Sequence, residues 1–176
     1  MKLKKIRVSL FETNSSSMHT LSIKPNESKC TDQQSIEDKM DSQGTMMISL
    51  GEYGRYGDPV ETHYEKICYL MTMFIYNNTA VTSQSDFDEL NEDVCQYFCH
   101  RTITNPKFVR SVYVVLDWIK ENYPDIEDVY FPYEPYFYCD HESSFDTVEE
   151  LFEHHGIESL DDIMARDCTI EIIGDE

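Results

Sequence analysis

Three stripes of apolar residues in the middle of the chain recur every three or four positions, a spacing that places side chains on one face of a helix. The stripes are Ile67, Leu70, Met71 and Phe74, then Leu90, Val94, Tyr97 and Phe98, and then Phe108, Val112, Val115, Leu116 and Ile119. The third stripe follows Asn105 and Pro106, a pair suited to a helix start, and should end near Pro124. The pattern predicts a block of about three consecutive helices.

Segments on both sides of this block show the patterns of strands. Lys5 to Phe11 alternates polar residues with Ile6, Val8 and Leu10, as a half-buried strand does. Further strands are predicted at residues 20–24, 46–50, 126–131, 136–139 and 168–173, and two short helices begin near Asp146 and Ser159. A chain of 176 residues suits one domain with a single core. We therefore expect a single α+β domain over residues 1–176, with a mixed β-sheet built from N- and C-terminal strands around the helices.

Residues 25–44 differ from their surroundings in composition. They are rich in Asn, Ser, Gln, Asp and Lys and contain few apolar residues. Such a segment buries little surface on folding, so we predict an exposed, mobile loop.

Charge is spread unevenly along the chain. The formal net charge is −20, yet residues 1–24 carry five basic residues and one acid. Residues 125–176 hold 17 acids against one arginine, a net charge of −16. A field of this sign opposes direct contact with DNA phosphates or an anionic membrane. A partner with a basic surface is expected instead.

The sequence also indicates a compartment. It contains no uninterrupted apolar run of about 18 residues, as a membrane span needs, and its basic start lacks the apolar stretch of a signal peptide. We expect a cytoplasmic protein whose six cysteines remain thiols. No cofactor or metal is expected, because Cys95, Cys99 and His100 lack the shorter spacing and the second ligand pair of a structural zinc site.

The turn between the first two predicted strands is unusual. It contains Asn14, Ser15, Ser16, Ser17 and His19. Asn and Ser side chains can shape a turn that exposes N–H groups and hydroxyls to a phosphate, and a histidine can act as a general base near neutral pH. The alternative is a tight turn whose hydroxyls bond only its own backbone.

A second polar segment, Asp140, His141 and Glu142, follows a predicted strand. If it met the first turn in space, His19, Asn14, Asp140 and His141 could support phosphodiester hydrolysis. A small hydrolase or nuclease is therefore one functional hypothesis. The alternative is that Asp140 only caps the next helix.

Three patches resemble a known family. The residues Phe11-Glu-Thr-Asn-Ser-Ser-Ser-Met-His19, the loop Gly51 to Pro59 and the segment Tyr138 to Ser143 are similar to blocks of a family of uncharacterised proteins of phages and mobile elements of Firmicutes. The resemblance implies a protein of a phage or mobile element that acts in the cytoplasm of the host cell. The small acidic proteins of such elements include anti-CRISPR and other anti-defence proteins. It implies no mechanism.

Charge and setting together favour an inhibitor that imitates nucleic acid. Its expected partner is a host defence nuclease, its guide-RNA complex, or another basic nucleic-acid-binding protein, whose DNA binding it would block. The acids predicted to contact this partner are Glu142, Glu149, Glu150, Glu153, Glu158, Asp161 and Asp162. The basic N-terminal strand could also pair with an acidic face, within one chain or across a homodimer.

The segment Tyr130 to Tyr138 holds six aromatic residues and two prolines. Core packing explains such a density of rings, and an aromatic anchor in a protein interface is the functional alternative.

Overall fold

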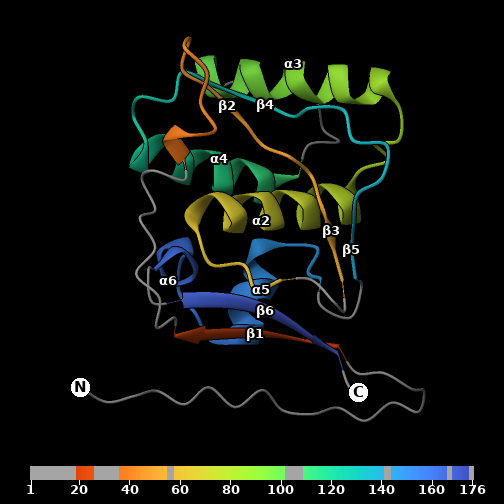
Figure 1. Cartoon of the computed structure of the whole chain (residues 1–176), viewed down its shortest axis with the longest axis vertical. Coiled ribbons are helices and arrows are strands. Elements are labelled where there is room, and N and C mark those ends of the chain that lie inside the picture. The colour runs from red at the N-terminus through yellow and green to blue at the C-terminus, as the bar shows by residue number, and fades with distance from the viewer. Residues whose placement is uncertain are drawn as a thin grey trace.

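The computed structural model describes residues 19–25, 36–54, 58–101, 109–140, 144–165 and 168–174. The strands are β1 (His19–Pro25), β2 (Thr45–Met47), β3 (Glu52–Tyr53), β4 (Asp128–Tyr130), β5 (Tyr138–Cys139) and β6 (Cys168–Gly174). The helices are α2 (His63–Asn78), α3 (Gln84–His100), α4 (Arg110–Asn122), α5 (Val148–His155) and α6 (Leu160–Met164). They stack along the long axis of the molecule, with α3 at one end, α4 and α2 in the middle, and α5, α6 and the β1–β6 pair at the other end (Figure 1).

The helix α2 forms the centre of the core. Every residue from Lys66 to Ile75 is buried, so the helix is covered on all sides and not only on its predicted apolar face. Two buried polar side chains have partners: the Lys66 Nζ donates to the carbonyl of Ala165 at 3.0 Å, and the Thr72 hydroxyl accepts from the Gly51 N–H at 3.0 Å. These bonds tie α2 to α6 and to the chain near β3. One apolar cluster joins α2 to all the other helices, which confirms a single α+β domain.

The helix α3 has a defined cap at each end, whereas α4 is described only from Arg110 onward. A capping box starts α3, because Ser83 accepts from the Asp86 N–H and Asp86 accepts from the Ser83 N–H at 2.8 Å. Arg101 ends it in the left-handed conformation, with φ of 55°. The described part of α4 starts at Arg110, so the predicted start at Asn105 lies outside the described residues.

A strand near each end of the chain was predicted, and these two strands pair with each other, whereas the alternating segment Lys5 to Phe11 lies outside the described residues. β1 and β6 are antiparallel, with His19 opposite Gly174 and Pro25 opposite Cys168. The other described strands form two parallel pairs, β2 with β4 and β3 with β5. The expectation of one mixed sheet is therefore wrong for these strands, which form three two-stranded sheets. The physical reason is α2, which lies between the β1–β6 pair and the β2–β4 pair, while β3 and β5 run alongside it (Figure 1).

The two parallel pairs are parts of one interrupted ribbon. Met47 pairs with Tyr130, and Glu52 pairs with Tyr138. The chain therefore advances five residues from Met47 to Glu52 on one strand and eight residues from Tyr130 to Tyr138 on the other. The three extra residues bulge outward between β4 and β5, within residues 131–137. We call residues 131–137 the aromatic loop.

The segment predicted to be mobile, residues 25–44, is described only in part. Pro25 belongs to β1, and residues 36–44 contain the buried Ile36 and a turn in which Met40 pairs with Met46. Residues 26–35 lie outside the described residues, and mobility remains a prediction.

Candidate functional site

Most residues of the hydrolase hypothesis lie outside the described residues. This is so for Asn14, for the turn serines Ser15, Ser16 and Ser17, and for His141 and Glu142. His19 begins β1, and Asp140 follows β5, where its N–H donates to the Tyr53 carbonyl at 2.9 Å. The hydrolase hypothesis therefore remains a prediction.

Three of the acids predicted to bind a partner also hold local structure. Glu150 accepts from the Asp146 N–H at 3.2 Å, at the start of α5. Asp162 accepts from the N–H groups of Glu158 and Ser159 at 2.9 and 3.2 Å, which caps α6. Asp161 accepts from the Trp118 indole N–H at 2.8 Å, which joins α6 to α4. These carboxylates stabilise the fold, so replacing them would confound a test of binding.

The other described acids of the predicted partner site are Glu149, Glu153 and Glu158, and all three are exposed. Glu149 and Glu153 lie on α5 and share a face at i and i+4, and Glu158 precedes α6. Glu149 lies 3.8 Å from the Arg110 guanidinium, and both side chains are more than half exposed. We call Glu149, Glu153 and Glu158 the α5–α6 acids.

A second acidic face lies at the opposite end of the molecule, on α3 (Figure 1). Asp88, Glu89 and Glu92 are exposed there, and α3 contains no lysine or arginine. The strand β4 packs against α3, which brings the acids of residues 125–128 to this end. The acidic part predicted from sequence, residues 125–176, is thus divided between two ends. The lack of basic residues in α3 is visible in the sequence.

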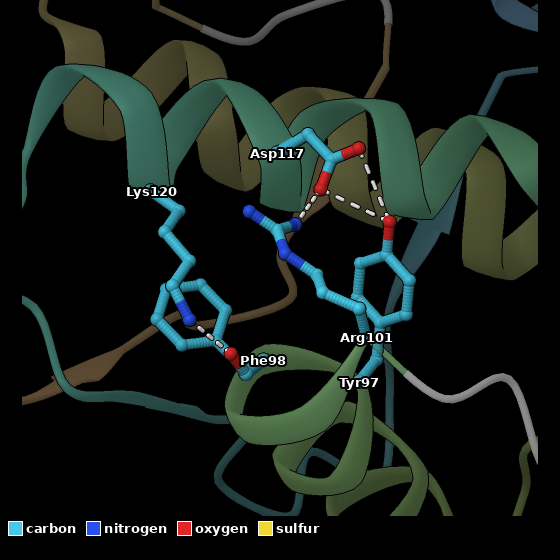
Figure 2. A network of polar contacts seen from close by, with 5 residues as sticks. All are labelled: Tyr97, Phe98, Arg101, Asp117 and Lys120. Atoms are coloured by element: carbon cyan, nitrogen blue, oxygen red, sulfur yellow. Dashed lines mark hydrogen bonds and ion pairs between the residues drawn. The ribbon is translucent and has the colours of Figure 1, made fainter.

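Basic residues next to α3 are engaged with neighbours (Figure 2). Arg101 forms an ion pair with Asp117, which also accepts from the Tyr97 hydroxyl at 3.0 Å. Lys120 donates to the Phe98 carbonyl and lies 4.7 Å from the centre of the Phe98 ring. These contacts join the C-terminal end of α3 to α4, where a helix favours cations.

The aromatic loop is anchored at both ends. The Asn91 side chain bonds the backbone of Phe131 twice, accepting from its N–H at 2.7 Å and donating to its carbonyl at 3.0 Å. The Phe87 ring on α3 makes edge-to-face contacts with Tyr133 and Phe137, with centroids 5.4 and 5.9 Å apart. Phe131 is buried and Phe137 is partly buried against the core, so core packing accounts for these two rings of the segment.

Other rings of this region face solvent and line a cleft. Tyr136 is 79% exposed, and Tyr76 and Tyr138 are about 40% exposed. They border an open cleft of about 430 Å³ between the end of α2 and the aromatic loop, together with Glu52 and Thr79. Gly54 allows this arrangement, because a Cβ there would lie 2.6 Å from the Tyr138 hydroxyl. We call this feature the tyrosine cleft.

Two buried thiols are suited to packing, not to chemistry. Burial raises the pKa of Cys68 to about 11 and that of Cys139 to about 12, so both are protonated at neutral pH. Among the described residues no group of three or more His, Cys, Asp or Glu side chains could hold a metal ion.

No family model, curated protein or solved structure matches this chain. Within the described part, no helix combines the length and the apolar character needed to cross a bilayer.

Proposed function

We propose that this protein is an anti-defence inhibitor that binds a basic nucleic-acid-binding protein, such as a guide-RNA-loaded CRISPR nuclease, through its acidic surface. The observation that carries the proposal is the net charge of −20 together with the exposed α5–α6 acids. In the proposal these carboxylates occupy a groove that otherwise receives phosphates, and they contain no bond that a nuclease could cleave.

Charge complementarity of this kind mainly raises the association rate of the two proteins. Complementary charge accelerates the encounter of two proteins by long-range attraction, and salt screens that attraction beyond about 8 Å at physiological ionic strength. A charge-imitating inhibitor should therefore associate more slowly as salt rises, while its dissociation rate changes little.

The test uses two variants with equal charge changes. In the first, Glu149, Glu153 and Glu158 are all replaced by Gln. In the control, Asp88→Asn, Glu89→Gln and Glu92→Gln remove three exposed charges at the other end of the molecule. Glu150, Asp161 and Asp162 are left in place because they stabilise α5 and α6.

The assay measures target-DNA binding and cleavage by a panel of purified, guide-RNA-loaded CRISPR nucleases. The wild-type protein should inhibit at least one of them, and the α5–α6 variant should associate with that nuclease about tenfold more slowly than the α3 control. Lack of inhibition across the panel would overturn the anti-CRISPR proposal. An equal or larger loss in the α3 control would overturn the assignment to the α5–α6 acids.

A further inference from the structure

We propose that the tyrosine cleft binds the guanidinium group of an arginine side chain of the partner. The inference rests on the proposed function for the identity of that partner, a basic protein. It assigns a second contact on a different part of the surface, with its own ligand chemistry.

The rings of the cleft supply the first attraction. Tyr76, Tyr136 and Tyr138 come from two separate segments of the chain and border the same space. The face of an aromatic ring carries partial negative charge and attracts a cation placed over it. The same protein already uses such contacts internally, as Arg101 lies over the Tyr97 ring at 5.5 Å and Lys39 over the Tyr64 ring at 5.3 Å.

Two further features of the cleft favour a positive charge. Glu52, an acidic residue, belongs to its lining. Tyr76 and Thr79 belong to the C-terminal end of α2, whose last turn contains no basic residue. The carbonyl end of a helix carries about half a negative charge, and that charge acts here from the helix end that borders the cleft.

These acceptors select among cations. A guanidinium group is planar, so it stacks on a tyrosine, and it has five N–H donors for carboxylate and carbonyl oxygens. A quaternary ammonium could also lie over the rings, but it has no N–H to donate. A lysine ammonium is a more strongly hydrated point charge, so it is less suited to a stacked site. The cleft thus fits arginine best.

The experiment titrates the full-length protein, with its tyrosine rings labelled for NMR, with three short peptides. The probe is acetyl-Gly-Arg-Gly-amide, and its matched controls carry citrulline or lysine in place of arginine. The arginine peptide should shift the ring signals of Tyr136 and Tyr138 saturably, with a Kd of about 1 mM. The citrulline peptide, of similar shape but uncharged, should bind at least tenfold more weakly.

Three variants then test whether the arginine peptide binds at the tyrosine cleft. Tyr136→Ala should weaken binding of the arginine peptide about tenfold, and Glu52→Gln should also weaken it. Tyr130→Ala is the control, because Tyr130 is an exposed tyrosine of the same ribbon that does not line the cleft. All three variants should retain the wild-type unfolding midpoint within a few degrees.

Four outcomes would overturn the inference. Three are equal binding of the arginine and citrulline peptides, equal binding of the arginine and lysine peptides, and equal effects of Tyr136→Ala and Tyr130→Ala. The fourth concerns a residue of the chain itself. The chain's own Arg55, which lies outside the described residues, is a rival occupant. If the peptide binds an Arg55→Gln variant but not the wild type, that rival is the occupant and the proposal fails. The titration needs no nuclease, so its failure leaves the inhibition assay untouched, and a failure of inhibition leaves the titration interpretable.

Discussion

His155 should make the stability of this protein fall in mild acid. The side chain ends α5 and is only 2% exposed, and its Nε2 has no hydrogen-bond partner among the described residues. The rings of Phe145 and His154 lie against it, with centroids 5.6 and 4.9 Å away. Burial, reinforced by His154, lowers the pKa of His155 from 6.5 to about 4. The folded state therefore holds this imidazole neutral.

The sign and size of the effect follow from that pKa. The His155 imidazole takes up a proton near pH 6.5 in the unfolded chain and only near pH 4 in the folded chain. Its contribution to the free energy of unfolding is therefore fully present above pH 6.5 and is lost as the pH falls toward 4. The loss is about 2 kcal/mol at pH 5 and approaches roughly 3 kcal/mol near pH 4.

Urea unfolding at pH 7.5 and pH 5, followed by circular dichroism, measures this loss. The many carboxylates also begin to titrate in this range, so the informative quantity is the difference between the wild type and a His155→Leu variant, which keeps the carboxylates and removes the imidazole. The wild type should lose about 2 kcal/mol more than this variant between the two pH values. His154→Gln should keep most of the wild-type pH dependence, because His154 is exposed and only reinforces the effect of burial on the pKa of His155. If wild type and His155→Leu show the same pH dependence, the buried imidazole is not the cause and the reasoning is refuted.

Two further substitutions test contacts that join elements. Ser111→Ala should lower the free energy of unfolding by about 1–3 kcal/mol, because the buried Ser111 hydroxyl accepts from the Val148 N–H at 2.9 Å and its loss leaves that donor unpaired; a denaturation midpoint equal to the wild type would contradict this. Arg101→Gly should be about 1 kcal/mol more stable than Arg101→Ala in thermal unfolding, since both lose the partly exposed ion pair to Asp117 but only glycine relieves the φ of 55°; equal stabilities would show that the left-handed cap carries no strain.

The helices could be predicted from the sequence because their periodicity is long and regular. The stripes beginning at Ile67 and Leu90 coincide with α2 and α3, and the strands predicted at residues 20–24 and 168–173 coincide with β1 and β6. The start of α5 was displaced by one residue, since Thr147 and not Asp146 is the N-cap. Both residues are good caps, so local sequence alone does not separate them.

The remaining features depend on contacts between distant segments. The burial of Lys66 needs the Ala165 carbonyl, 99 residues away, and no local pattern reports that pairing. The three extra residues of the aromatic loop become visible only when Met47 and Glu52 are aligned with their partners. The candidate acids were found as a group, but the sequence could not separate those that accept hydrogen bonds within the fold, Glu150, Asp161 and Asp162, from Glu149, Glu153 and Glu158. The tyrosine cleft was missed because Tyr76 and Tyr136 come from different segments.

In the interrupted ribbon, the exposed residues of the aromatic loop are separate from the residues that pair in the strands. Phe131 and Phe137 hold the ends of the aromatic loop against α3, so the residues between them contribute side chains to the surface without carrying the ladders on either side. Loops of other lengths and sequences could be grafted between those two anchors while β2–β4 and β3–β5 keep their register. The scaffold is in this sense a display platform: of the residues between the anchors, Pro135 and Tyr136 line the tyrosine cleft, and changing them alters that surface while Tyr133 keeps its contact with Phe87.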